Sequence, residues 1–329
     1  MKAIQMGRFG GVEVLDVIDA AIPEPAADQV LVRVHAAGVN FADTLMRQNR
    51  YALTPELPAI LGHEVSGVIE GVGSQVSGLT VGMRVAAPLF AAGIWFGGYA
   101  EYAAIDADLI VPLPDALSFE HATALMVQGL TAHYLIQQAP PRGKSVLVSA
   151  AAGGVGTILV QLAKRAGAKT VMAAASTDRK LDVARSLGAD VGINYANAGW
   201  GDRVRAATGG AGADIIYESA GGEVTTTSLQ ALAPLGQLVI YGALNIQSFN
   251  LGVPELLGLI FKNQSLTGFA VAPLLTAQGL RSALKELFGL ALAGDVRVTI
   301  GGHFALEQAA DAHRAIEERR TIGKIVLAA

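Results

Sequence analysis

A run of small residues follows an apolar segment near the middle of the chain. Ser145–Ser149 reads Ser-Val-Leu-Val-Ser, and helical periodicity begins near Gly153. A strand, a small-residue turn and a helix in this order present unpaired backbone N–H groups and the positive end of a helix dipole to a pyrophosphate. In this context a glycine pattern predicts a dinucleotide-binding turn. The residues expected to approach the phosphates are Ala152, Gly153, Gly154, Val155 and Gly156.

The residues after the next predicted strand bear on which dinucleotide binds. Folds that bind NAD usually end this strand with an Asp or Glu that holds the ribose 2′-hydroxyl. Here the strand Thr170–Ala175 is followed by Ser-Thr-Asp-Arg-Lys. Ser176 and Lys180 supply a hydroxyl donor and positive charge, which a 2′-phosphate requires, so NADPH is favoured over NADH. The alternative is that Arg179 and Lys180 form a solvated first helical turn, with Asp178 as the expected helix cap.

Composition limits the possible classes of protein. The chain has 329 residues, 52% of them hydrophobic and 16% charged, which is enough for two domains with buried cores. The net charge of −4 leaves no basic face for nucleic acid, and the lack of cysteine excludes disulfides, thiolate nucleophiles and Cys-ligated zinc. No stretch approaches the ~20 apolar residues that span a bilayer, and the N-terminus lacks a signal-peptide pattern. We therefore expect a cytoplasmic protein.

The elements that must position these residues fall into two regions. Up to about residue 120, short strands alternate with turns, which is typical of a β-rich, barrel-like domain. From Ser145 onwards, strands alternate with helices that begin near Gly153, Asp178, Gly201, Glu223 and Val253. This alternation predicts a doubly wound parallel sheet. Its six strands are expected at Ser145–Ser149, Thr170–Ala175, Val191–Tyr195, Asp214–Glu218, Gln237–Tyr241 and Ser265–Val271.

After residue 272, the regular alternation of predicted strands and helices becomes less clear. Gln278–Ala293 and Leu306–Arg320 are predicted as amphipathic helices, and a closing strand begins at Gly323. We expect this segment to return to the first domain. The predicted domains are therefore residues 1–122 with 272–329, and an inserted nucleotide-binding domain at 123–271. The nicotinamide is expected in the cleft between them.

Several motifs together resemble one family. They are Gly38-Val-Asn-Phe-Ala-Asp43, Gly62-His-Glu-Val-Ser-Gly67, Ala150-Ala-Ala-Gly-Gly-Val-Gly156, Gly188-Ala-Asp, Ile193-Asn-Tyr195 and Gly323-Lys-Ile-Val-Leu327. In this order and spacing, they resemble the zinc-independent medium-chain dehydrogenases/reductases of the quinone oxidoreductase (zeta-crystallin-like) group. The resemblance implies an α/β fold, with a GroES-like β-rich catalytic domain and an inserted Rossmann domain. It also implies a homodimer joined through the edge of the nucleotide-binding sheet.

The resemblance also bears on metal. In the alcohol dehydrogenase branch, a Cys, a His and a second Cys hold a catalytic zinc. Here Asn40 and Val127 stand at the two Cys positions, and only His63 remains. One imidazole cannot assemble a zinc site, so no metal is predicted and His63 is interpreted as a structural or hydrogen-bonding residue.

Without a metal, hydride delivery to an electron-poor π system is easier than alcohol oxidation. The resemblance therefore implies NADPH-dependent reduction of quinones or small α,β-unsaturated carbonyls, with a small-molecule partner. Two alternatives remain open. One is an enoyl-thioester (enoyl-CoA or acyl-carrier-protein) reductase, and the other is a catalytically silent NADPH-binding protein. The physiological acceptor, and whether one or two electrons are transferred, also remain open.

Site residues of the first domain follow from the resemblance. In the resembling enzymes, the segment with the predicted short helix Phe41–Arg47 lines the nicotinamide and acceptor pocket. Asn40, close to the reacting carbonyl, and Asp43 are therefore expected to be catalytic, as is Tyr51, and Phe41 and Thr44 are expected to contact the cofactor. Asn40 is alternatively a helix N-cap, and the two roles are compatible. Tyr51 occupies the place of a Tyr proposed to deliver a proton in related enoyl-thioester reductases. Its alternative role is simple packing.

The remaining predicted cofactor contacts lie mostly where strands end. The residues carried over are Gln128, Thr131, Tyr195, Ser219, the segment Tyr241-Gly242-Ala243, Phe269, Val271 and Arg319. For the glycines, ordinary turn chemistry is an equally good explanation. The other histidines, at positions 35, 121, 133, 303 and 313, have no ligand spacing and are interpreted as structural.

Overall fold

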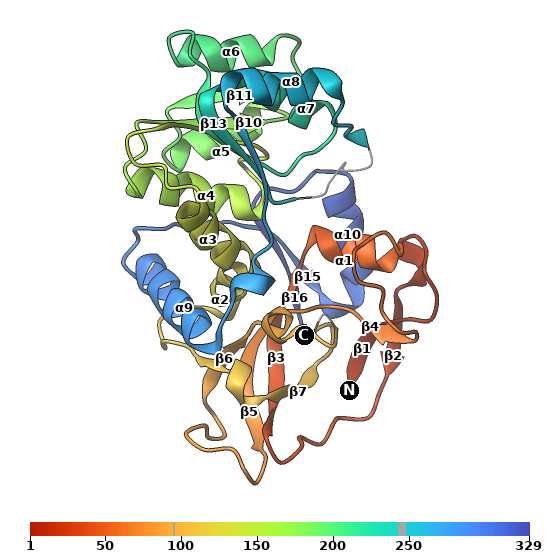
Figure 1. The fold of residues 1–329 in the computed structure, drawn as a ribbon. Coiled ribbons are helices and arrows are strands. Elements are labelled where there is room, and N and C mark those ends of the chain that lie inside the picture. Colours follow the sequence, from red (N-terminus) through yellow and green to blue (C-terminus); the bar gives the residue numbers. More distant parts are fainter. Residues whose placement is uncertain (95, 243–247) are drawn as a thin grey trace. The chain divides into compact units, whose positions relative to one another are not determined.

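The computed structural model describes residues 1–94, 96–242 and 248–329. The chain divides into two compact units (Figure 1). Unit 1 comprises Met1–Leu130 and Ala272–Ala329, and unit 2 comprises Thr131–Val271.

Unit 1 is built on a seven-stranded sheet centred on a long strand, β3 (Gln29–Val39). The closing strand, β16 (Lys324–Ala328), pairs with β3 antiparallel, so the C-terminal segment completes the sheet that the N-terminal segment begins. The other strands of this sheet are β5 (Val65–Val72), β6 (Arg84–Ala87), β7 (Tyr102–Asp106), β8 (Val111–Pro112) and β15 (Ile300–Ala305). A smaller sheet contains β1 (Lys2–Met6), β2 (Asp16–Asp19) and β4 (Ala59–Ile60).

Three helices of unit 1 correspond to sequence predictions. The first, α1 (Phe41–Arg47), spans its predicted range, and α9 (Ala277–Leu292) is shifted by one residue from the expected Gln278–Ala293. The helix α10 (Ala309–Glu317) is shorter than the expected Leu306–Arg320, because its first turn, Leu306–Gln308, is a 3-10 helix. Another helix of this unit is α2 (Phe119–Ala124), for which no limits were predicted. A π-helical stretch, Leu125–Gly129, continues from α2 into α3 (Leu130–Gln138).

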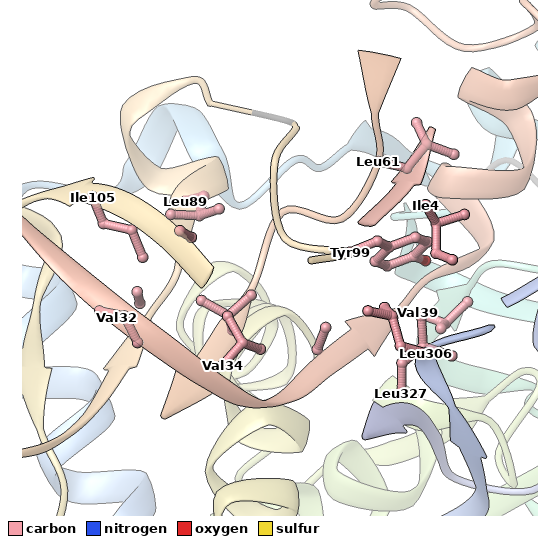
Figure 2. Close-up of a cluster of buried hydrophobic side chains, with 14 of the residues drawn as sticks. Ile4, Val32, Val34, Val39, Leu61, Leu89, Tyr99, Ile105, Leu306 and Leu327 are labelled. Atoms are coloured by element: carbon pink, nitrogen blue, oxygen red, sulfur yellow. The ribbon is translucent and has the colours of Figure 1, made fainter. Parts of the chain in front are cut away.

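The core of unit 1 follows from the period-two pattern of β3. Val30, Val32 and Val34 are buried, while the intervening Arg33 is exposed. Figure 2 shows Val32 and Val34 within the resulting cluster, together with Tyr99. Burying a valine side chain stabilises a fold by about 1.5–3 kcal/mol relative to leaving it exposed, so this face fixes the register of the sheet.

Unit 2 is the predicted doubly wound sheet (Figure 1). Its six strands are all parallel, in the order β11-β10-β9-β12-β13-β14, which is the Rossmann order. The strands are β9 (Ser145–Val148), β10 (Thr170–Ala175), β11 (Val191–Asn194), β12 (Ala213–Glu218), β13 (Leu232–Ile240) and β14 (Ser265–Gly268). The crossover helices are α4 (Gly154–Arg165), α5 (Asp178–Ser186), α6 (Trp200–Ala207), α7 (Glu223–Ala231) and α8 (Val253–Lys262).

Both faces of the central strands are buried, which explains their nearly continuous apolar sequences. On one face, Leu147 and Ile216 pack in a cluster with Trp200 of α6 and Leu229 of α7. On the other face, the hydroxyl of Tyr217 donates a hydrogen bond to the carbonyl of Ala139, just after α3. Across the described ranges of the chain, no helix is long and apolar enough to cross a membrane.

Candidate active site

The turn between β9 and α4 has the geometry expected of a phosphate-binding turn. Gly153 is the N-cap, and α4 begins at Gly154 with no acidic side chain in its first turn. A Cβ at Gly156 would lie 2.5 Å from the carbonyl oxygen of Ala150 and 2.7 Å from the Cα of Ala151. Only glycine therefore allows the helix to start this close to the strand. The N–H groups of the first turn of α4 are suited to an anionic ligand.

Those predicted residues of unit 2 that follow strands lie along one edge of the sheet, because the carboxyl ends of parallel strands share an edge. Ser219 follows β12, and its backbone N–H donates to Ser149 Oγ (2.8 Å), just after β9. Tyr241 follows β13, and a Cβ at Gly242 would lie 2.5 Å from the Cβ of Ser219. Burial raises the pKa of Tyr241, while a side-chain hydrogen bond with Ser219 opposes that shift.

Glu218 organises this edge, and the sequence analysis did not identify it. Its buried carboxylate accepts hydrogen bonds from the backbone N–H groups of Ala220 (2.7 Å) and Gly221 (3.1 Å) and from Thr225 Oγ1 (2.9 Å). Burial raises the pKa of Glu218, and these bonds work in the opposite direction. The available sequence signal was an acid at the end of the strand Ala213–Glu218, directly after the run Ile-Ile-Tyr.

The segment after β10 corrects one prediction. Thr177, not Asp178, is the N-cap of α5, and its hydroxyl accepts from the backbone N–H of Lys180 (3.4 Å). Asp178 is the first helical residue, and its carboxylate accepts a hydrogen bond from Asn194 (3.3 Å), at the end of β11. Lys180 is half-buried, whereas Arg179 is exposed.

The predicted site residues divide between the two units. Unit 1 holds Asn40, Phe41, Asp43, Thr44, Tyr51, Gln128 and Arg319. Unit 2 holds Thr131, Ala152, Gly153, Gly154, Val155, Gly156, Ser176, Lys180, Tyr195, Ser219, Tyr241, Gly242, Phe269 and Val271. Ala243 lies outside the described residues.

In unit 1, a polar network forms where β3 leads into α1. Asn40 is the N-cap residue, and its backbone N–H donates to Asp43 Oδ2 (2.7 Å). Its side chain makes no capping hydrogen bond. Thr44 is buried, and its hydroxyl donates to the carbonyl of Phe41 (2.8 Å).

The carboxamide of Asn40 instead joins four other side chains. Its nitrogen donates to Glu64 Oε1 (2.8 Å) and lies 3.2 Å from His63 Nε2. Its oxygen accepts from Gln128 Nε2 (2.6 Å) and Lys324 Nζ (2.8 Å). Two donors and two acceptors fill the hydrogen-bonding capacity of a primary amide.

Two oppositely charged side chains of this network form an ion pair in the protein interior. Lys324 forms an ion pair with Glu64, and both side chains are almost completely buried. Burial lowers the pKa of Lys324, and the Glu64 carboxylate opposes that shift. The second oxygen of Glu64 accepts from the backbone N–H of Val127 (2.8 Å). Gly38 makes room for Glu64, since a Cβ there would lie 2.2 Å from Glu64 Oε1.

Asp43 anchors the other half of the network. One carboxylate oxygen lies 2.9 Å from His63 Nδ1, and the other accepts from the Tyr99 hydroxyl (3.0 Å). Burial acts to raise the pKa of Asp43, but His63, His313 and the backbone N–H of Asn40 outweigh it, so that the pKa lies below its usual value.

Arg47 and His313 extend this network towards Glu317. His313 Nε2 lies 3.2 Å from the Tyr99 hydroxyl, and its Nδ1 lies 3.0 Å from an Arg47 nitrogen. Burial, with the Arg47 charge, lowers the pKa of His313 to about 4, although Asp43 acts against this shift. Arg47, itself buried, also forms an ion pair with Glu317 (2.6 Å).

Tyr51 and Arg319 are two further predicted site residues of unit 1. Tyr51 is half-buried on the segment after α1 and packs against the core of unit 1. Burial and the Asp43 charge raise the pKa of Tyr51. Arg319 is exposed just after α10, with a positive φ of 54°.

The sequence alone did not indicate that Lys324, Glu64, Tyr99 and Arg47 belong to one network. A signal was present for the first two. Lys324 opens the strand Lys-Ile-Val-Leu-Ala, and Glu64 directly precedes the largely buried strand Val65–Val72. Charges in such positions are almost never buried unless paired, so each predicts a partner.

Comparisons with known proteins agree with this architecture. Residues 26–115 match the alcohol dehydrogenase GroES-like domain family, and residues 154–288 match the zinc-binding dehydrogenase family. A quinone oxidoreductase of Pseudomonas aeruginosa is 38% identical over 331 residues, covering 99% of each chain. A 2-haloacrylate reductase of Burkholderia is 35% identical, covering 94% of this chain and 93% of that protein. The solved structure of Escherichia coli quinone oxidoreductase complexed with NADPH is 31% identical, with a TM-score of 0.91 and 100% of each chain covered.

The chain belongs to the quinone oxidoreductase group of the medium-chain dehydrogenases/reductases. The family resemblance and the fold class predicted from the sequence are thereby confirmed, and the family is one of oxidoreductases.

The residues of this quinone oxidoreductase family member do not fit a catalytic zinc. Val127 offers no side-chain donor, and the Asn40 carboxamide is already occupied by four side chains. The Lys324 ammonium is itself a cation bonded to Asn40 and Glu64. Within residues 1–94, 96–242 and 248–329, no group of three His, Cys, Asp or Glu side chains is placed to hold a metal ion.

Proposed function

We propose that this protein reduces quinones or small α,β-unsaturated carbonyls, with NADPH as the reductant and no metal. The observation that carries the proposal is the buried Lys324 ammonium, bonded to Asn40 and Glu64 beside the positions that would ligate zinc. A Lewis acid chiefly assists reactions at alcohols and simple carbonyls. Conjugated acceptors need mainly orientation and a hydrogen bond to the oxygen that gains charge.

Unit 2 would hold NADPH by its backbone. The N–H groups at the start of α4 would receive the pyrophosphate, and Ser176 with Lys180 would receive the 2′-phosphate. The Escherichia coli relative is described with NADPH, which supports this choice. Bound NADPH would supply the hydride.

In unit 1, Asn40 and Asp43 would act as positioning residues. Their polar atoms already interact with interior partners: the Asn40 amide donates a hydrogen bond to Glu64, and the Asp43 carboxylate contacts His63. Tyr51 is the candidate proton donor, because a phenol is protonated at neutral pH and can donate to an oxyanion or enolate. Burial and the Asp43 charge raise its pKa, which keeps it in that form but makes it a weaker acid.

A steady-state assay of NADPH oxidation tests the proposal. We expect turnover with 1,4-benzoquinone, 1,4-naphthoquinone or a short alkenal, and the rate should be unchanged by a metal chelator. Turnover with crotonyl-CoA alone would instead identify an enoyl-thioester reductase. NADPH binding without turnover of any acceptor would identify a catalytically silent protein.

We also propose a homodimer formed through the edge of the unit 2 sheet. β14 is an edge strand, and α8, the helix that precedes it, has no buried residue in the single chain. Val253, Ile260 and Phe261 are 68%, 66% and 81% exposed. An exposed apolar helix and an open strand edge are each suited to a second copy of the same surface.

Light scattering on purified variants tests the dimer. Phe261→Glu should shift the molar mass from that of a dimer to that of a monomer. Val81→Glu is the matched control, because Val81 is a 64% exposed apolar residue of unit 1. A monomeric wild-type protein at micromolar concentration would refute this assembly.

A further inference from the structure

Gln128 carries a buried hydrogen-bond acceptor that its surroundings leave unpaired. The residue is 7% exposed, and its Nε2 donates to Asn40 Oδ1 at 2.6 Å. Its Oε1 is buried and has no hydrogen-bond partner within residues 1–94, 96–242 and 248–329. Buried side-chain acceptors nearly always have a partner, so this oxygen requires an explanation.

The orientation of the Gln128 amide is dictated by its neighbours. Lys324 has only donors, so the atom of Asn40 that faces it must be the oxygen. Gln128 must then present its nitrogen to that same oxygen. Reversing either amide would place two donors or two acceptors against each other. Lys324 therefore determines, through Asn40, that Gln128 Oε1 is the amide atom without a hydrogen-bond partner among the described residues.

The local backbone gives a second reason to regard this position as functional. Gln128 lies in the π-helical stretch Leu125–Gly129, where Glu64 Oε2 accepts a hydrogen bond from the backbone N–H of Val127. Single π-helical turns within α-helices occur frequently at functional sites. Here the widened turn carries Gln128.

We propose that Gln128 Oε1 binds a neutral N–H or O–H donor of a bound small molecule. A quinone or enone carbonyl cannot fill this role, because it is also an acceptor. Two participants in the proposed reaction carry a suitable donor: the primary carboxamide of the nicotinamide ring and the hydroxyl of a hydroquinone product. The inference rests on the proposed function in naming these two sources.

The first experiment compares NADPH with its reduced 3-acetylpyridine analogue, which keeps the carbonyl but replaces the amide NH₂ with a methyl group. Dissociation constants are measured by fluorescence titration for the wild type, Gln128→Met and the control Gln48→Met. Gln48 is a half-buried glutamine of the same unit, bonded to Glu317. We expect the preference for NADPH over the analogue to fall by roughly five- to tenfold in Gln128→Met alone.

The second experiment compares 1,4-dihydroxynaphthalene with 1,4-dimethoxynaphthalene under anaerobic conditions. If the hydroquinone is the donor, Gln128→Met should weaken binding of the dihydroxy compound alone, again by roughly five- to tenfold. A change in either pair supports the proposal and identifies the donor.

Unchanged preferences in both pairs would mean that Gln128 Oε1 holds only water, and would overturn the proposal. If Gln128→Met does not fold, the test uses the wild type alone. Equal affinity of the wild type for the two compounds of each pair would then also overturn the proposal. Failure of the wild type to bind NADPH would instead refute the proposed function, leaving the naphthalene pair to test Gln128.

Discussion

The candidate sites of the two units depend on different physical features. In unit 2, the β9–α4 turn is made of neighbouring residues, and its geometry depends on the absence of side chains at positions such as Gly156. In unit 1, the polar network joins residues far apart in the sequence, and Asn40 and Lys324 are separated by 284 positions. The first site should be sensitive to added volume, and the second to a change of charge.

The largest effect is expected at the buried ion pair. Lys324→Met keeps most of the side-chain volume but leaves the Glu64 carboxylate without its cation. Removing one partner of a buried pair typically costs about 3–5 kcal/mol. Urea unfolding should therefore show a loss of this size in the free energy of unfolding.

Two further variants sharpen this result. Lys164→Met removes an exposed ion pair with Asp190 and should cost less than about 1 kcal/mol. The double variant Glu64→Gln with Lys324→Met, which removes both charges, should be more stable than Lys324→Met alone. If Lys324→Met matches the wild type, charge pairing does not control unit 1.

The next effect is a pH dependence centred on His313. Its pKa is lowered from 6.5 to about 4 by burial and by Arg47, so the folded protein keeps it neutral. Between these pH values, the unfolded chain binds a proton that the folded protein does not. The free energy of unfolding should therefore fall by about 3 kcal/mol as the pH falls from 6.5 to 4.

His313→Gln should remove this component of the pH dependence, because a glutamine amide can still accept from Arg47 and donate to Tyr99. The free energy of unfolding is measured against pH for the wild type and for His313→Gln. The difference between the two plots isolates the contribution of residue 313 from those of other groups, including Glu218, whose raised pKa changes stability in the opposite direction. Parallel curves for the two proteins would contradict a neutral buried His313.

The same contrast explains what the sequence could predict. In unit 2, strand Thr170–Ala175 and the starts of α5, α7 and α8 match the structure, because apolar periodicity and glycine turns are local signals. The cap of α5 was assigned one residue too late. Thr177 and Asp178 are adjacent and both suit an N-cap, so residue type alone could not choose between them.

In unit 1, α1 was predicted at its observed limits, Phe41–Arg47, but the partners of Asn40 were not. Those partners come from separate strands and a π-helical stretch, so only the folded sheet brings them together. The sequence could indicate that Lys324 and Glu64 each need a partner. It could not show that they pair with each other.

A smaller effect is expected from added volume at the phosphate-binding turn. Gly156→Ala places a Cβ against the backbone of Ala150 and Ala151, which no rotamer change can relieve. Overpacking of this kind typically costs about 1–3 kcal/mol. NADPH affinity, measured by fluorescence titration, should also fall by about tenfold or more, because the start of α4 must shift.

Gly258→Ala provides the control, because a Cβ at Gly258 in α8 meets nothing within 4 Å. It should not weaken NADPH binding. Equal affinities for Gly156→Ala and Gly258→Ala would show that the close approach of α4 to β9 is unimportant for the cofactor.

The smallest effect tests charge in unit 2, where backbone geometry otherwise dominates. Lys180→Glu reverses the charge expected to meet the 2′-phosphate, and should raise the KM for NADPH by about tenfold with little change for NADH. Arg179→Glu makes the same change at the neighbouring, exposed position and should leave the ratio nearly unaltered. Equal effects of the two variants would mean that a diffuse positive field, rather than a specific contact at Lys180, selects the phosphate. Unit 2 would then differ from unit 1 even in its use of charge, because unit 1 holds each buried charge against a defined partner.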